Sequence, residues 1–270
     1  MQLEKILATA RGAAQAAAAV HRRHLGRVEV SAWGEKGFAD FVSHVDREAE
    51  ARILERIRAA HPDHGILAEE TAAAGPEAAS AGDWLWVVDP LDGTTNYLHA
   101  YPMYAVSVAV LYGGDPVVGV VVNGASGEEW TATRGGGAFR DGTPIRVSAI
   151  DSLAQALIGT GFPFKVPEYI PEYLEQLGLL LRASAGVRRA GSAALDLCHL
   201  ASGWFDGFWE LSLAPWDVAA GSLIVREAGG TVTRLAGGHD VVGQGSILAG
   251  NPHIYRALQV LIGGREPRAR

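Results

Sequence analysis

The sequence predicts an α/β protein in which helices and sheets alternate in layers. Its 270 residues are 48% hydrophobic, which is enough to bury a large core. The middle of the chain reads as successive strands joined by tight turns, and the second half alternates strand and helix patterns. No linker separates the two parts, so we expect residues 1–270 to form one domain. We expect two lobes, about 1–150 and 151–265, and a frayed tail over 264–270.

Two amphipathic helices are predicted at the start of the chain. Apolar residues and alanines recur at helical spacing from Leu3 to about Leu25. A second helix is expected within residues 43–62, where the same spacing continues until a His-Pro pair stops it. Ser43 and Asp46 fit a capping box, which places Asp46 in the first turn of this helix.

Two short buried strands follow, and each ends in carboxylates. We expect them at residues 65–70 and 84–88, with Asp89 at the exit of the second strand. Pro90 cannot extend a strand ladder, so the chain is expected to leave the sheet at that point. The segment between the strands, residues 71–83, is rich in Ala, Gly and Ser and predicts a surface loop.

The remaining elements are predicted from turn residues and periodicity. Residues 104–123 read as a hairpin that turns at Gly113-Gly114-Asp115, and residues 128–147 continue the sheet through an Asp141-Gly142 turn. The second half predicts strands within 155–163, 205–211, 231–235 and 246–251, and helices within 168–184, 191–203, 216–230 and 252–264.

Composition excludes several classes of protein. The net charge of −7 gives no support to a nucleic-acid-coating role, and no uncharged apolar run reaches the ~20 residues of a membrane span. Cys198 is the only cysteine, which excludes an internal disulfide and suits a reducing, cytoplasmic location. We expect Cys198 and the tryptophans, Trp204 among them, to pack in the core or beside strand ends, and the histidines to be surface or core residues.

The stretch VVDPLDGTTN, residues 87–96, carries the strongest indication of chemistry. Taken alone, Asp89 could end a strand and Asp92-Gly93 could form a turn. However, two carboxylates on one turn repel each other unless a cation lies between them, and a hard cation prefers oxygen ligands. The carbonyl of Leu91 could add a third oxygen, and free backbone N–H groups beyond Gly93 could bind an anion. Carboxylates beside free amides are the arrangement that a phosphate ester needs.

Three further carboxylates can be interpreted either as structural residues or as part of the same site. Glu69 and Glu70 are successive strand residues, so at most one of them is expected to point to the same site. Asp217 precedes an apolar helical pattern and reads as an N-cap, although a carboxylate can cap a helix and bind a metal together.

At this point the sequence resembles a known family. WVVDPLDGTTNY and WDVAAGSLIVREAGG are similar to the two signature segments of the inositol monophosphatase family, which comprises Mg²⁺-dependent, lithium-sensitive phosphatases. LAEET, DFVSHVDREAE and RRAGSAALDLCHLASGWFDGFWEL also match, in the expected order, and the wording is nearest the bacterial branch. The resemblance extends from about Lys36 to Asn251.

The resemblance implies a layered α-β-α-β-α sandwich and a homodimer. It places two or three Mg²⁺ ions among the side chains of Glu69, Asp89, Asp92 and Asp217 and the carbonyl of Leu91. Thr94, paired with Asp46, would activate the attacking water, and the amides of Gly93 and Thr94 would hold the phosphate. Lys36 would lie on a mobile loop, and the alcohol part of the substrate would face Gly191, Ser192, Ala193 and Glu210.

The substrate is expected to be a small phosphate monoester, first of all inositol monophosphate. Glu210 suits such a polyol because a carboxylate can accept hydrogen bonds from two vicinal hydroxyls. Fructose 1,6-bisphosphate, histidinol phosphate and 3′-phosphorylated nucleotides are alternatives within the same superfamily. A non-catalytic polyol-phosphate binder or protein-interaction module is the alternative from another class. Arg188-Arg189 could attract an anionic substrate or lie at a dimer contact, and the sequence leaves this open.

Overall fold

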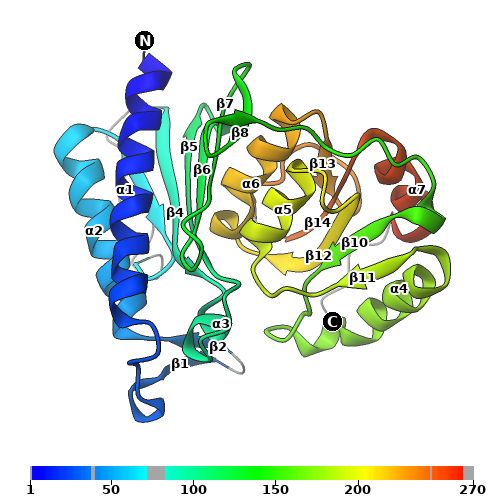
Figure 1. The fold of residues 1–270 in the computed structure, drawn as a ribbon, viewed down its shortest axis with the longest axis horizontal. Coiled ribbons are helices and arrows are strands. Elements are labelled where there is room, and N and C mark those ends of the chain that lie inside the picture. Colours follow the sequence, from blue (N-terminus) through cyan, green and yellow to red (C-terminus); the bar gives the residue numbers. More distant parts are fainter. Residues whose placement is uncertain (1, 38–39, 72–82, 244, 264–270) are drawn as a thin grey trace.

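Helices and sheets alternate in five layers in the computed structural model (Figure 1). The structure describes residues 2–37, 40–71, 83–243 and 245–263. Most of the predicted surface loop, residues 72–82, and the tail 264–270 lie outside these residues. In order, the layers are helices α1 and α2, a seven-stranded sheet, helices α5 and α6, a five-stranded sheet, and helices α4 and α7. This order confirms the predicted layered α/β fold.

The first layer contains the two predicted amphipathic helices, α1 (Gln2–His24) and α2 (His44–Ala60). Their apolar faces cover one side of the larger sheet, against β4, β5 and β6. The predicted capping box is present: the Ser43 hydroxyl accepts the Val45 N–H at 3.1 Å, and Asp46 Oδ2 accepts the Ser43 N–H at 2.8 Å. This cap fixes the position of Asp46 at the start of α2.

The seven-stranded sheet has the strand order β3-β4-β5-β6-β7-β8-β9. Strands β3 and β4 are parallel and every later pair is antiparallel, as expected for the predicted hairpins. Its strands are β3 (Gly65–Ala68), β4 (Trp84–Asp92), β5 (Ala105–Tyr112), β6 (Asp115–Asn123), β7 (Glu129–Thr133), β8 (Gly137–Arg140) and β9 (Thr143–Pro144). A small hairpin, β1 (Gly34–Gly37) and β2 (Asp40–Val42), and the short helix α3 (Thr94–Leu98) lie near one end of this sheet (Figure 1).

The five-stranded sheet has the order β11-β10-β12-β14-β13 and mixes parallel with antiparallel pairs. Its strands are β10 (Leu157–Thr160), β11 (Gly186–Arg188), β12 (Gly207–Leu213), β13 (Thr231–Arg234) and β14 (Gly245–Gly250). Strand β11 was not predicted, because three residues after a helix are too short to show a period of two. The outer helices are α4 (Ile170–Ala183) and α7 (Pro252–Ile262).

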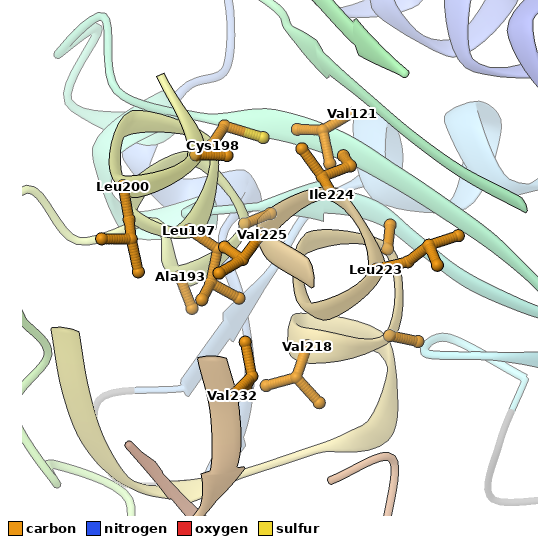
Figure 2. Packing of buried hydrophobic residues seen from close by; sticks show 14 of the residues in the cluster. Val121, Ala193, Leu197, Cys198, Leu200, Val218, Leu223, Ile224, Val225 and Val232 are labelled. Carbon is orange, nitrogen blue, oxygen red and sulfur yellow. The ribbon is translucent and has the colours of Figure 1, made fainter. Parts of the chain in front are cut away.

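Helices α5 (Ala193–Ala201) and α6 (Pro215–Glu227) lie between the two sheets and are almost wholly apolar where they are buried. Figure 2 shows their side chains packed against each other, with Val121 of the larger sheet and Val232 of the smaller sheet on either side. Cys198 is completely buried in this cluster, as predicted. This central layer joins the sheets and brings the starts of both helices to the same end of the molecule.

Trp204 departs from the prediction that the tryptophans are in the core. It follows the end of α5 and is 45% exposed, and the Arg140 guanidinium lies 4.8 Å from the centre of its ring. An arginine stacked on the indole face replaces part of the missing packing. Among the described residues, no helix has the length and apolar character needed to cross a membrane.

Candidate active site

The carboxylates of VVDPLDGTTN lie on a bulge inside strand β4. The prediction that the strand ends at Asp89 is wrong: β4 continues across Pro90 to Asp92. Asp89 pairs with Ser107 and Asp92 pairs with Ala105, so β4 has one residue more than β5 between these pairs. Such a bulge accommodates a proline, because the extra residues leave the ladder. The bulge turns the side chains of Asp89 and Asp92 towards one place.

Local hydrogen bonds hold the bulge in shape. Asp89 Oδ1 accepts the Leu91 N–H at 2.9 Å, and the Leu91 carbonyl accepts the Thr94 hydroxyl at 3.0 Å. Gly93 follows with φ 87°, and a Cβ there would approach the Met103 carbonyl oxygen to 2.9 Å. Only glycine fits this position without displacing the neighbouring backbone. The short helix α3 then begins at Thr94.

Asp92 connects the bulge to the predicted substrate segment 191–193. Its Oδ2 accepts a 2.5 Å hydrogen bond from the Ser192 hydroxyl and a 2.8 Å hydrogen bond from the Ala194 N–H. The Asn96 side-chain amide donates to the Ala190 carbonyl at 2.9 Å, which joins the same two segments again. The start of α5 is therefore fixed to the bulge although it lies about a hundred residues further along the chain.

Asp217 occupies a different helix position from the one predicted. Helix α6 begins at Pro215 with Ala214 as its N-cap residue, so Asp217 lies in the first turn and is not the N-cap. Its Oδ2 accepts the Ala214 N–H at 2.7 Å. One oxygen thus satisfies the helix end, and the other stays free for a second contact.

Three carboxylates converge at this point. One oxygen from each of Asp89, Asp92 and Asp217 lies within 4.8 Å of the others. Asp89 and Asp92 are 2% and 9% exposed. Burial and the neighbouring carboxylates raise the pKa of Asp89 well above its usual value. Burial raises the pKa of Asp92 to about 6, against the hydrogen bonds from Ser192 and Ala194. Burial and Asp92 raise the pKa of Asp217 to about 7.

This group of oxygens fits a hard divalent cation. The donors are carboxylates only, with a backbone carbonyl beside them, which suits Mg²⁺ better than a metal that prefers nitrogen or sulfur. Burial first, and repulsion between the neighbouring carboxylates second, raises the pKa of Asp89 and of Asp217, and a cation would offset both effects.

Thr94 and Asp46 form a pair next to the carboxylates. The Thr94 hydroxyl lies 3.0 Å from Asp46 Oδ1, while Ser43 donates to Asp46 Oδ2 through its N–H and its hydroxyl. Burial raises the pKa of Asp46, and the hydrogen bonds from Ser43 and Thr94 oppose that rise. The sequence-based pairing of these two residues is therefore present in the geometry.

A cavity of about 370 Å³ opens over the carboxylates. Most of the predicted site residues line it: Glu69, Asp89, Leu91, Asp92, Gly93, Thr94, Gly191, Ala193, Glu210 and Asp217. Asp46 and Ser192 are buried beside it, within hydrogen-bonding distance of Thr94 and Asp92 respectively. Lys36 lies on strand β1 and not in a loop as predicted, and its side chain is outside those that the structure describes. The backbone N–H of Glu70 donates a hydrogen bond to Glu50 Oε2 at 2.8 Å.

Several residues on the cavity wall were not predicted. Phe162, Phe164 and Lys165 follow strand β10, and the Arg189 guanidinium lies 5.1 Å and 5.3 Å from the two phenylalanine ring centres. The signal in the sequence was the apolar pair in GFPFK directly after a strand, which reads equally well as core. Arg189 therefore faces the cavity, whereas Arg188 is not among the residues that line it. Burial and the carboxylates of Asp196 and Asp217 raise the pKa of Glu210 well above its usual value.

Comparison with known proteins gives a consistent result. The sequence model of the inositol monophosphatase family matches residues 2–263. An inositol-1-monophosphatase of Rhizobium meliloti is 47% identical over 241 residues, which cover 89% of each chain. The protein named Nus factor SuhB in Pseudomonas aeruginosa is 43% identical over 262 residues, which cover 96% of each chain.

A solved structure extends this similarity to the fold. The extragenic suppressor protein suhB from Bartonella henselae superposes with a TM-score of 0.90 at 41% identity, covering 95% of this chain and 98% of that one.

Proposed function

Because the chain belongs to the inositol monophosphatase family, we propose that it hydrolyses small phosphate monoesters with the help of Mg²⁺, with inositol monophosphate as the preferred substrate. The observation that carries the proposal is the convergence of Asp89, Asp92 and Asp217 under a cavity large enough for a polyol phosphate. A chain that had lost catalysis would have no reason to keep three mutually repelling carboxylates so close together.

The carboxylates would hold the metal ions together with Glu69 and the Leu91 carbonyl. When bound, Mg²⁺ neutralises phosphate oxygens and increases the acidity of a coordinated water. Asp92 keeps its direction because Ser192 and Ala194 hold its Oδ2, and Asp217 keeps its direction because Ala214 holds its Oδ2. The amides of Gly93 and Thr94 would hold the phosphate at the end of the bulge.

Thr94 and Asp46 would handle the proton of the attacking water. The Thr94 hydroxyl lies 3.0 Å from both Asp46 Oδ1 and the Leu91 carbonyl oxygen, so its single proton can point to Asp46 while a lone pair accepts a hydrogen bond from a water. The proton of that water can pass through Thr94 to Asp46, whose raised pKa makes its carboxylate a better base than an exposed aspartate.

The alcohol side of the substrate would face Gly191, Ala193 and Glu210, with Ser192 buried behind them. Arg189 and Lys165 add positive charge to the same wall and would attract an anionic substrate. Lys36 stays a further prediction as a residue near the site.

The test of the proposal is phosphate release from a panel of phosphate monoesters, measured with Mg²⁺ and with EDTA. The panel contains inositol monophosphate, fructose 1,6-bisphosphate, histidinol phosphate and 3′-phosphorylated nucleotides. We expect Mg²⁺-dependent release, greatest for inositol monophosphate, and inhibition by millimolar lithium. A different preferred substrate would change the assigned specificity, whereas no release from any ester would contradict the proposal.

A second role, in protein binding, is favoured by the relatives named Nus factor SuhB. We propose that this chain can share the role of the Pseudomonas aeruginosa protein, and that it does so as a homodimer. Helix α4 offers a surface for association, since Ile170, Leu174 and Leu181 are 39%, 57% and 62% exposed at helical spacing. Complementation of a strain without that relative, by wild type and by Asp92→Asn, tests whether this role needs turnover, and sedimentation tests the dimer.

A further inference from the structure

A buried histidine lies directly behind the bulge that carries the carboxylates. His21, on α1, has no exposed surface, and its Nε2 lies 2.9 Å from the carbonyl oxygen of Pro90. Pro90 is the residue between Asp89 and Leu91 in β4. A helix at the start of the chain thus touches the one part of β4 that departs from regular pairing.

One peptide group links this histidine to a proposed metal ligand. The carbonyl of Pro90 and the N–H of Leu91 belong to the same planar peptide unit, so fixing one of them fixes the other. The Leu91 N–H donates to Asp89 Oδ1 at 2.9 Å. The hydrogen bonds therefore run from the His21 ring, through a single peptide, to the carboxylate of Asp89. Successive hydrogen bonds of this kind polarise and strengthen one another.

The protonation of the ring follows from its surroundings. Burial lowers the pKa of His21 to about 4, so the ring is neutral near pH 7 and carries one N–H. A carbonyl oxygen only accepts hydrogen bonds, which assigns the proton to Nε2. Nδ1 is then a buried acceptor, and it has no partner among the described residues. A buried unpaired nitrogen is unfavourable, so packing alone does not account for a histidine here, whereas the contact with Pro90 does.

The walls around the ring fix its direction. The rings of Tyr97 and Tyr104 lie 5.7 Å and 5.8 Å from the ring of His21, centre to centre. The Tyr97 hydroxyl donates to the His21 carbonyl at 3.0 Å, which ties α3 to α1. A Cβ at Gly124 would come within 2.7 Å of His21 Nδ1. The histidine side chain therefore has little freedom to turn its Nε2 away from Pro90.

We infer that His21 is a positioning residue for metal binding: its Nε2–H holds the Pro90–Leu91 peptide, and that peptide directs the Asp89 carboxylate towards the cation. The inference rests on the proposed function, because Asp89 is a ligand only if the site binds Mg²⁺. His21 itself touches neither substrate nor metal in this account.

The test compares two replacements that differ in the donor. His21→Gln keeps a side-chain N–H that can reach Pro90, whereas His21→Leu fills a similar volume without a donor. By calorimetric titration of the metal-free protein, we expect Mg²⁺ affinity to fall about tenfold in His21→Leu and to stay within about threefold in His21→Gln. At saturating Mg²⁺ we expect turnover in both variants to approach that of wild type.

A matched control separates positioning from packing. Tyr104 packs on His21, and its buried hydroxyl has no partner among the described residues, so Tyr104→Phe should leave Mg²⁺ affinity unchanged. A second readout needs no metal: hydrogen exchange of the backbone amides over residues 87–93 should be faster in His21→Leu than in His21→Gln. If His21→Leu fails to fold, His21→Asn replaces it, because its shorter amide cannot reach Pro90.

The outcomes distinguish this inference from the function on which it rests. Equal Mg²⁺ affinity and equal amide exchange in the Leu and Gln variants would overturn the role of His21 while leaving the metal site intact. Absence of Mg²⁺ binding in wild type would instead overturn the proposed function. Weakened binding in Tyr104→Phe to the same extent as in His21→Leu would show that packing, not the Nε2 hydrogen bond, supports the site.

Discussion

Helices α2 and α6 each carry an aspartate at the same position in the first turn, and the two aspartates have different surroundings. Asp46 follows its N-cap, Ser43, by three residues, and Asp217 follows Ala214 by three residues. Each uses its Oδ2 to accept the N–H of the N-cap residue, at 2.8 Å and 2.7 Å. The helix end therefore directs the second oxygen of each: that of Asp46 lies beside Thr94, and that of Asp217 lies at the cavity.

The difference between the two lies in the number of donors around the carboxylate. Asp46 also accepts the Ser43 hydroxyl at 2.7 Å and the Thr94 hydroxyl at 3.0 Å. The N-cap residue of α6 is Ala214, which has no hydroxyl to donate to Asp217. The Asp217 carboxylate also lies near that of Asp92. The first carboxylate is satisfied by the protein and can exchange a proton with Thr94. The second needs a cation, so the residue at the N-cap decides what the same helix position can do.

Replacing Asp92, the carboxylate next to Asp217, should have the largest effect on turnover. Asp92→Asn keeps an oxygen for Ser192 and Ala194, so we expect normal folding and a loss of turnover of at least about 10³-fold. Asp141→Asn, an exposed aspartate in the β8–β9 turn, is the control and should keep wild-type turnover. Substantial turnover in Asp92→Asn would contradict the metal assignment.

Replacing Asp217 and Asp46 by asparagine, each in its own variant, should separate their roles. Asp217→Asn should weaken Mg²⁺ affinity by at least about 100-fold, because it removes a charged ligand while keeping the contact with Ala214. Asp46→Asn should reduce kcat by about 10²- to 10⁴-fold with nearly unchanged Mg²⁺ affinity, because it removes a proton acceptor. Calorimetry and steady-state kinetics measure the two effects. Equal loss of Mg²⁺ affinity in both variants would remove the distinction.

The pH dependence of stability should differ between the same two variants. Asp217 has a pKa of about 7 in the folded protein and ~3.9 when unfolded, so the folded state binds more protons between these values. Its contribution to the free energy of unfolding is therefore lost as pH rises from about 4 to 7. Metal-free Asp217→Asn should gain stability relative to wild type across this window, and Asp46→Asn should gain less, because hydrogen bonds oppose the raised pKa of Asp46.

Urea unfolding at pH 4, 5.5 and 7 measures this difference. Comparing each variant with wild type cancels the opposite contribution of buried histidines such as His199, whose pKa burial lowers to about 4. Mg²⁺ at pH 7 should reverse the order of stability for Asp217→Asn. A pH-independent difference would contradict the picture of a buried carboxylate whose charge is left uncompensated when the metal is absent.

Giving α2 an alanine as its N-cap residue, as in α6, should have the smallest effect of these replacements. Ser43→Ala removes the hydroxyl that caps α2 and donates to Asp46. We expect the free energy of unfolding to fall by about 1 kcal/mol and turnover to fall only several-fold, with Mg²⁺ affinity unchanged. Thermal unfolding and kinetics test this. A loss of turnover as large as in Asp46→Asn would show that Asp46 depends on the Ser43 hydroxyl for its role.

Sequence reasoning predicted the parts of the molecule that depend on local periodicity. The long helices, the β5–β6 hairpin and the capping box of α2 all appear where their patterns placed them. It missed the course of β4 because Pro90 usually ends a ladder, and only pairing with β5 on both sides of the bulge keeps the strand in the sheet.

Residues of the candidate site were predictable where they stand in a contiguous motif, and not where only the fold brings them together. Asp89, Asp92, Thr94 and Asp217 stand in motifs with recognisable spacing. His21 lies 69 residues from Pro90 in sequence, so nothing local indicates their contact. Phe162 and Phe164 look like core residues until the structure places them on the cavity wall.

The most direct test of the account is a crystal structure of the protein soaked with Mn²⁺, an anomalously scattering substitute for Mg²⁺. We expect an anomalous peak within coordination distance of the carboxylates of Asp89, Asp92 and Asp217, and no such peak at the Asp217 position in Asp217→Asn crystals. A wild-type map without a peak at these three carboxylates, at Mn²⁺ concentrations that support phosphate release, would contradict it.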